Sequence, residues 1–156
     1  PPPAPRPPPP PTPPTPGPPP PPAAGKSAAE ASEFTLGFTP ILAPMSRGIL
    51  ATVSARMTDK AKALSDEEIR AVWSKAYEGQ DFMVLLPEGT LPATGNIIGS
   101  NAAHLQVVTD RKAGRIYAFA AIDNLNRGTA GQAVQSLNIA LGLPEDAGLT
   151  KIGVAP

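Results

Sequence analysis

Few side chains in this chain of 156 residues could carry acid–base, nucleophilic or metal chemistry. It has one histidine, His104, and no cysteine, which excludes a cysteine nucleophile, a thiolate metal site and a disulfide framework. Strand alternation places His104 opposite Leu105 and Val107, so we expect it to face solvent or a subunit contact and to be structural. No spacing of His, Asp or Glu resembles a metal site. We therefore assign no catalytic residue and no metal ligand.

The carboxylates Asp66, Glu67 and Glu68 are explained by helix formation. Ser65 and Glu68 form a capping box, and acidic side chains are favoured in the first turn of a helix. The predicted helix ends at Gly79. Its expected core face carries apolar residues at helical spacing: Ile69, Val72, Trp73, Ala76 and Tyr77.

The segment from Asp123 to Gln132 is the candidate for ligand contact. It joins the end of a predicted strand to the start of a predicted helix through a polar turn that contains Gly128 and Gly131. Such a junction exposes backbone N–H groups and lets a ligand approach closely. The alternative is that Asn or Thr caps the helix and the glycines serve tight packing, and the spacing alone favours this alternative.

The elements that would position this turn are strands and two helices. Strands are predicted at 34–40, 48–57 and 82–86, and a hairpin at 101–109 and 115–122. The second helix, 128–141, ends at Gly142 and Pro144 and carries one apolar face: Ala130, Ala133, Val134, Leu137 and Leu141. Residues 41–47 read as a loop. The pattern predicts an α+β fold with a largely antiparallel sheet and helices on one face.

The chain divides into a proline-rich arm with a small-residue linker, 1–33, and a folded part, 34–156. Of its 23 prolines, 17 fall within residues 1–22, and all the aromatic residues follow from Phe34 onward. The arm favours polyproline II, which fits either a ligand for proline-recognising domains or a spacer. The chain begins with proline, and we expect it to be incomplete.

Charge and hydropathy exclude several partners. Thirteen Lys and Arg balance thirteen Asp and Glu, so the basic footprint of a nucleic-acid-binding protein is missing. The sequence has no apolar run long enough for a membrane span and no signal segment at its start. The absence of cysteine is compatible with a cytoplasmic location.

Three stretches resemble the C-terminal part of N-acetyl-gamma-glutamyl-phosphate reductases. They are FTPILAPMSRGILATVSARM, PEGTLPATGNIIGSNAAHLQVV and AAIDNLNRGTAGQAVQSLNIALGLPEDAGL, and the closing GVAP is similar to actinobacterial members. The most specific motif is Asp-Asn-Leu-x-Lys/Arg-Gly-x-Ala-Gly-Gln-Ala-x-Gln, which matches at 123–135. The resemblance implies the C-terminal catalytic and dimerisation domain of the semialdehyde-dehydrogenase-like reductases, and hence a homo-oligomer.

The resemblance also implies an activity in arginine biosynthesis. The family reduces the acyl phosphate N-acetyl-gamma-glutamyl phosphate to the semialdehyde with NADPH, through a cysteine thioester. By this resemblance the turn at 123–131 lies on the nicotinamide side of NADPH, and Asn124 and Gly128 are the expected cofactor contacts.

The departures from the family pattern predict an inactive chain. The catalytic cysteine and the glycine-rich nucleotide-binding turn are absent, Ile41 stands where the family commonly has histidine, and His104 cannot replace the catalytic histidine. We expect no turnover, very weak NADPH binding and a tendency to self-associate. The alternative function is a non-catalytic interaction protein with a polyproline arm.

Overall fold

The computed structural model of the chain describes residues 36–154. The chain divides into two compact units, Pro1–Leu42 and Ala43–Pro156. The predicted arm, the linker and their boundary at residue 33 lie outside the described residues. In the described part of the first unit, residues 36–42 form no regular secondary structure and expose Leu36, Phe38 and Ile41. The strand predicted at 34–40 is therefore wrong over its described residues, because the segment has no ladder partner there and Pro40 lacks an N–H.

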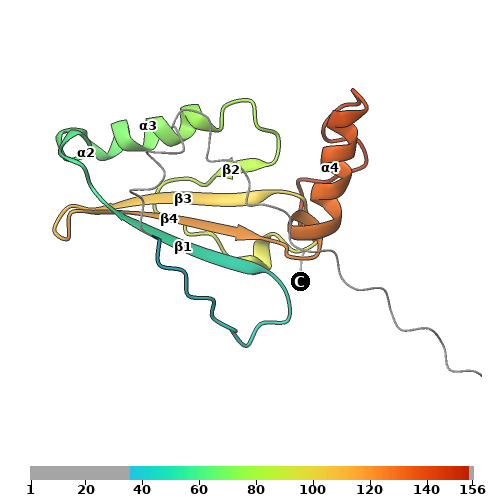
Figure 1. The fold of residues 1–156 in the computed structure, drawn as a ribbon, viewed down its shortest axis with the longest axis horizontal. Helices are drawn as coiled ribbons and strands as arrows, with labels where there is room; N and C mark the ends of the chain where they lie inside the picture. The colour runs from blue at the N-terminus through green and yellow to red at the C-terminus, as the bar shows by residue number, and fades with distance from the viewer. Residues whose placement is uncertain (1–35, 155–156) are drawn as a thin grey trace, which may run out of the picture. The chain divides into compact units, whose positions relative to one another are not determined.

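The second unit is built on a four-stranded sheet. Its strands are β1 (Ile49–Arg56), β2 (Met83–Leu85), β3 (Ala103–Asp110) and β4 (Arg115–Ile122), in the order β1-β4-β3-β2 (Figure 1). β4 pairs antiparallel with both β1 and β3, and β2 pairs parallel with β3. The strands predicted at 48–57, 82–86 and the hairpin are confirmed, and so is the largely antiparallel α+β fold.

The register separates the two faces of the sheet. Residues opposite one another in adjacent strands point to the same side, so Leu105, Ala120 and Ala51 share one face. His104 and Ala121 lie on the other face, as the alternation predicts. β1 forms one edge of the sheet and is exposed along its whole length.

Two helices precede β2. α2 (Asp59–Ala63) was not predicted, although Thr58 accepts a hydrogen bond from the Ala61 N–H at 3.2 Å as its N-cap. α3 (Asp66–Ala76) begins at the predicted capping box: the Ser65 N–H donates to Glu68 Oε2 at 2.7 Å, and the Glu68 N–H donates to Ser65 Oγ at 3.2 Å.

α3 packs on the sheet through part of its predicted core face. Ile69 is buried with Met57 and Val107, and Trp73 and Ile116 pack against this cluster. Val72 is exposed, because the stripe of α3 that contacts the sheet is narrower than the apolar face predicted from the sequence. A second cluster lies on the opposite face, where Ile97, beside the 3₁₀ turn η1 (Thr94–Asn96), packs with Ala102, which precedes β3, and with Ala121 of β4.

A buried amide ties α3 to the free edge of β3 beyond the end of β2. Gln106 Nε2 donates to the carbonyls of Pro87 at 2.7 Å and Thr90 at 2.8 Å. Its Oε1 accepts from Arg70 Nη1 at 2.6 Å and from the Val107 N–H at 3.1 Å. All the hydrogen-bonding groups of this amide are thus used, although Gln106 is only 2% exposed.

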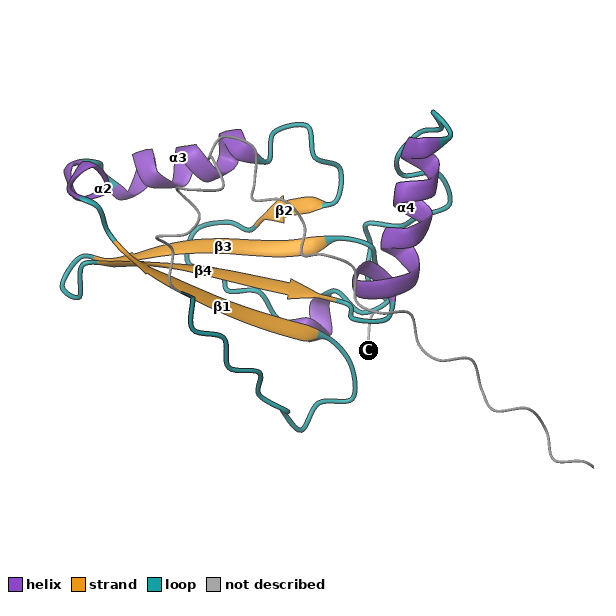
Figure 2. Ribbon diagram, in the orientation of Figure 1, coloured by secondary structure: helices purple, strands orange, loops and turns teal. Residues whose placement is uncertain are grey.

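The second predicted helix has two parts, the π-helical turn η2 (Asn126–Ala130) and α4 (Gly131–Ala140), which stands at the end of the sheet (Figure 2). Its predicted apolar face is exposed at Val134, Leu137 and Leu141. The side turned inward is polar, since Gly131 and Asn138 are the buried residues of α4. The physical reason is that α4 is fixed by hydrogen bonds, described below, rather than by apolar packing.

Between residues 36 and 154, no helix is long and apolar enough to cross a membrane.

Candidate functional site

Asp123, directly after β4, organises the candidate turn. Its side chain is fully buried and forms an ion pair with Arg47, with Nε 2.9 Å from Oδ1 and Nη2 2.7 Å from Oδ2. The same carboxylate accepts backbone N–H groups from Gly99 at 2.6 Å, Leu125 at 2.8 Å and Asn126 at 3.1 Å. One side chain therefore fixes three loops that are far apart in sequence.

The surroundings of Asp123 favour its charged form. Burial alone raises the pKa of a carboxyl, but the Arg47 guanidinium and the three backbone N–H groups outweigh burial and lower the pKa of Asp123 from 3.8 to about 2. The ion pair with Arg47 is therefore intact at neutral pH. Arg47 remains partly accessible, with 34% of its side chain exposed.

Asn124, a predicted cofactor contact, lies beside this centre and is half-buried. Its Oδ1 accepts a hydrogen bond from the Gly48 N–H at 2.7 Å. Because this position must be an acceptor, the other terminal atom of the amide is Nδ2. Among residues 36–154, Asn124 Nδ2 has no hydrogen-bond partner, which leaves its two donor hydrogens unused within the described chain. The Asn124 carbonyl accepts from Thr129 Oγ1 at 2.7 Å, which fixes the backbone of the turn.

Gly128, the second predicted contact, differs from Gly131 in its surroundings. A Cβ at Gly128 would lie 3.5 Å from Ile122 Cδ1 and 3.6 Å from the Asp123 carbonyl oxygen, which are ordinary contacts. A Cβ at Gly131 would collide with Asn101 Oδ1 and Asn126 Oδ1. The packing interpretation therefore holds for Gly131, whereas packing within the described chain does not require glycine at position 128.

The backbone N–H groups of the turn are used within the chain. Those of Leu125 and Asn126 donate to Asp123 Oδ1, that of Gly128 donates to the Asp123 carbonyl at 2.9 Å, and that of Ala130 to the Leu125 carbonyl at 3.3 Å. The expectation that this junction exposes N–H groups is thus wrong for these four. A ligand here would meet the Asn124 amide and the open surface of Gly128 rather than an anion-binding cradle.

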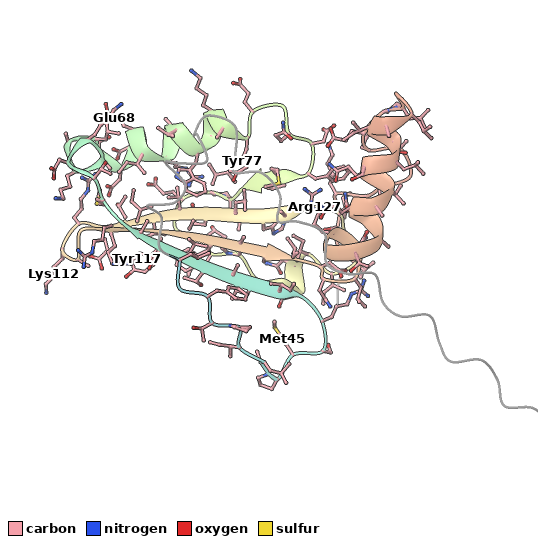
Figure 3. The ribbon with its side chains drawn as sticks, viewed as in Figure 1. Met45, Glu68, Tyr77, Lys112, Tyr117 and Arg127 are labelled. Carbon is pink, nitrogen blue, oxygen red and sulfur yellow. The ribbon has the colours of Figure 1, made fainter. Side chains whose placement is uncertain are left out.

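A second polar group lies between the turn and α4. Gln135 Oε1 accepts from Asn101 Nδ2 at 3.1 Å and from Arg127 Nη1. The Arg127 guanidinium stands 5.9 Å from the centre of the buried Phe82 ring. Figure 3 shows Arg127 between the end of the sheet and α4. Burial lowers the pKa of Arg127, and the nearby Glu145 carboxylate acts against this shift. This network fixes the start of α4 relative to the sheet.

His104 does not join the turn. It is half-buried, and its Nδ1 is a buried atom without a hydrogen-bond partner among the described residues. Burial lowers the pKa of His104. Its expected place on the face opposite Leu105 is confirmed. Its ring is more enclosed than that of a side chain that faces solvent. No group of three or more His, Asp or Glu in the described part could hold a metal ion.

Sequence reasoning missed Arg47, Gly48 and Gly99, all of which contact Asp123 or Asn124. For Gly48 the usable signal is the glycine itself. The structure shows why glycine is needed there: its backbone has φ 104°, a conformation that favours glycine, and a Cβ would lie 2.7 Å from Thr94 Cβ. The pairing of Arg47 with Asp123 joins residues 76 positions apart, which no local pattern reveals.

Comparisons with known proteins agree with this architecture. Residues 23–124 match the family model described as semialdehyde dehydrogenase, dimerisation domain. Over 134 residues, 86% of this chain, it is 99% identical to an N-acetyl-gamma-glutamyl-phosphate reductase of Bifidobacterium longum (strain DJO10A). Proteins of the same name from Bifidobacterium animalis subsp. lactis (strain AD011) and Mycobacterium avium (strain 104) are 63% and 54% identical over the same share. In each case the match covers 37% of the relative's length.

Proposed function

The chain belongs to the semialdehyde dehydrogenase dimerisation-domain family, and on this premise we propose that it forms the cofactor-facing and subunit-pairing part of an N-acetyl-gamma-glutamyl-phosphate reductase. Such an enzyme would reduce an acyl phosphate with NADPH in cytoplasmic arginine biosynthesis. The chain spans little more than a third of its curated relatives, and the proposed activity belongs to the longer assembly.

The turn at 123–128 carries this proposal. The Gly48 N–H donates to the side-chain oxygen of Asn124, and the amide hydrogens of Asn124 are unused among the described residues, next to a glycine that packing does not require. An amide donor beside an unobstructed backbone suits a flat, amide-bearing ring such as nicotinamide. NADPH, when bound, would supply hydride, while Asn124 and Gly128 would orient its ring and the Arg47–Asp123 pair would keep both residues in place.

The same chain is not expected to turn over substrate alone. It has no cysteine, so the thioester step lacks its nucleophile. We expect no NADPH oxidation when the purified chain is mixed with NADPH and N-acetyl-gamma-glutamyl phosphate. Oxidation above a blank without protein would contradict this.

Complementation provides the positive test. The 156-residue chain is co-expressed with the segment of the B. longum reductase that lies outside the match, and NADPH oxidation is followed by the loss of absorbance of the reduced nicotinamide. Asn124→Asp keeps the acceptor for Gly48 but removes the outward donor, so we expect the KM for NADPH to rise about tenfold. Asn96→Asp, at an exposed asparagine of η1, is the matched control for the added charge. Equal KM values for the two variants would contradict the role of Asn124.

We also propose that two copies of the chain pair through the sheet. β1 leaves Ile49, Leu50 and Val53 between 48% and 57% exposed along one edge, and the matching family model is described as a dimerisation domain. An exposed apolar strand at an edge of a sheet normally requires a cover.

A further inference from the structure

β2 forms the second edge of the sheet, and only alternate residues of this segment are bonded to β3. The Phe82 carbonyl accepts from the Ala103 N–H at 2.7 Å, and the Leu86 N–H donates to the Leu105 carbonyl at 2.9 Å. Consecutive residues of a strand direct their backbone groups to opposite sides, so Phe82, Val84 and Leu86 use theirs on β3.

The residues in between, Met83 and Leu85, direct their backbone groups to the free edge. The Met83 N–H donates to the Gln80 carbonyl at 3.2 Å. Within residues 36–154, the Met83 carbonyl and both backbone groups of Leu85 have no hydrogen-bond partner. Both residues are half-buried, and backbone groups shielded from water are nearly always paired. β2 is short but carries neither a proline nor a charge, the residues that commonly block the addition of a strand at an edge.

A groove of about 770 Å³ lies between β2 and one side of α3. Met83 and Leu85 line it from the strand, because their side chains share the face of the sheet that carries Leu105. α3 packs on β3 and β4 through Val107 and Ile116, which leaves this face of β2 open. Figure 1 shows α3 alongside β2, with a loop that joins them at one end. The volume falls within the range of ligand sites, about 300 to 1,000 Å³.

The helical wall of the groove carries charges in a defined order. Glu67, Arg70 and Lys75 lie on one side of α3, and Glu78 follows in the turn after its end. Arg70 Nη2 donates to the Leu86 carbonyl just beyond β2, whereas Glu78 lies near the start of β2. The order along the groove is therefore negative, positive, positive, negative.

These charges are not neutralised within the described chain. Among residues 36–154, none of the four takes part in an ion pair. Arg70 is bonded to the Gln106 amide and to a backbone carbonyl, and both of these groups are neutral. The wall therefore complements a segment with an acidic side chain at its centre and a basic side chain on either side.

The spacing suits an extended segment. The helix rises roughly 12 Å between Glu67 and Lys75, and Glu78 lies about one turn further. Side chains at positions i, i+2 and i+4 of a strand point to one face and span roughly 13 Å. Three such side chains thus reach along this wall, with the central one between Arg70 and Lys75.

We propose that the groove between α3 and β2 binds an extended segment of a partner polypeptide with the pattern basic–x–acidic–x–basic. The segment adds a strand to β2 through the unused backbone groups, a known mode of peptide recognition. Its acidic side chain lies between Lys75 and Arg70, and its basic side chains lie at Glu67 and Glu78. The inference does not rest on the proposed function, because no residue of the turn at 123–128 lines the groove.

Peptide binding to the complete chain of 156 residues tests this proposal. The probe is the synthetic peptide Thr-Lys-Val-Glu-Val-Lys-Thr, blocked at both ends and labelled with a fluorophore, and its fluorescence anisotropy is followed in a titration. We expect saturable binding. The charge-reversed peptide Thr-Glu-Val-Lys-Val-Glu-Thr should bind at least about tenfold more weakly.

Backbone methylation separates strand addition from charge attraction alone. Alternate N–H groups of an added strand face β2, so methylation of the glutamate N–H and of the next valine N–H, in separate peptides, should differ in effect. One of these peptides should bind at least about tenfold more weakly, and the other should stay within about threefold of the parent peptide. Hydrogen exchange at the Leu85 amide should slow at least about tenfold in the complex.

Two pairs of protein variants test the walls of the groove. Ser74→Trp fills it and should weaken binding at least about tenfold, whereas Val72→Trp, at a 61% exposed valine of α3 outside the groove, should not. Lys75→Glu should weaken binding at least about fivefold. Its control is Lys112→Glu, at an exposed lysine of the hairpin turn. Circular dichroism checks that all four variants are folded.

Several results would overturn the proposal. They are no binding of the peptide at about 1 mM, equal binding of the two charge patterns, equal effects of the two methylations, and parental binding by Ser74→Trp and Lys75→Glu. If the chain alone self-associates and Ser74→Trp reduces its mass to that of one copy, the groove belongs to a second copy instead.

Discussion

Gly128 and Gly131 lie three residues apart in one turn and have different reasons to be glycine. Gly131 is enclosed by the side-chain oxygens of Asn101 and Asn126, which leave no room for a Cβ. Asn101 Oδ1 is a buried acceptor without a hydrogen-bond partner among the described residues. At Gly128 a Cβ would make only ordinary contacts with Ile122 and Asp123, so packing within the described chain does not require glycine there.

The two glycines give a prediction for stability. Gly131→Ala should lower the free energy of unfolding by about 2 kcal/mol, because the added methyl group must displace the buried Asn101 amide and the half-buried Asn126 amide. Gly128→Ala should leave it unchanged or raise it by about 0.5 kcal/mol, since alanine restricts the unfolded chain more than glycine does. Urea denaturation measures both, and equal losses for the two variants would contradict this assignment.

Asp123 gives a prediction for pH dependence. Its folded-state pKa is lowered to about 2 from an ordinary value of 3.8, so its contribution is complete above pH 4 to 5 (about one unit over the unfolded pKa) and is lost as the pH falls through about 2. The size of this contribution is about 2 kcal/mol. Asp123→Asn should therefore be less stable at neutral pH and should lose less stability on acidification.

Thermal unfolding from about pH 7 down to about pH 2, a range that spans the unfolded and folded pKa of Asp123, measures this slope. Asp59→Asn is the control, because Asp59 pairs with Lys62 at the surface and its side chain is 98% exposed. Parallel pH profiles for Asp123→Asn and the parent chain would show that Asp123 does not carry the effect.

At the scale of elements, the amide of Gln106 joins α3, the loop after β2 and the edge of β3. Gln106→Leu should lower the free energy of unfolding by about 3 kcal/mol, because Arg70 and two backbone carbonyls lose their partner in a buried place. Gln80→Leu, at an exposed position of the loop before β2, should change it by less than about 0.5 kcal/mol. Urea unfolding compares the two variants. If Gln106→Leu lowers the free energy of unfolding by less than about 1 kcal/mol, the value of one ordinary hydrogen bond, Gln106 does not hold these elements together.

The elements also show where sequence reasoning works. The capping box at Ser65, the hairpin at 101–109 and 115–122, and the end of the second helix at Gly142 depend on local chemistry, and the structure confirms them. The inward side of α4 depends on distant partners such as Asn101 and Glu145, and hydrophobic periodicity predicts the opposite side. The strand predicted at 34–40 had the right alternation over its described residues but no neighbour with which to pair there.

The candidate site follows the same rule. Sequence reasoning located the turn at 123–131, because its polar residues and glycines are contiguous. The ion pair of Arg47 with Asp123 and the bond from Gly48 to Asn124 required the fold, since β1 and β4 must first pair to bring these residues together. Whether Asn124 and Gly128 contact a cofactor stays a prediction.

For the whole molecule, exposed apolar residues on β1 and α4 predict association. At about 50 micromolar, a concentration at which interfaces of ordinary size are populated, light scattering should give a mass above that of one chain. Val53→Lys should shift the chain toward the monomer, because it places a charge on the exposed edge strand. A monodisperse parent chain with the mass of a single copy would contradict this prediction.

The location of the single tryptophan has a practical consequence for all these measurements. Trp73 is a residue of α3 and packs against the cluster of Met57, Ile69 and Val107. Neither β1 nor α4 carries a tryptophan. Its emission therefore reports the melting of the α3–sheet layer. A second copy that binds β1 leaves this fluorophore in place, so one optical signal separates loss of folding from loss of assembly.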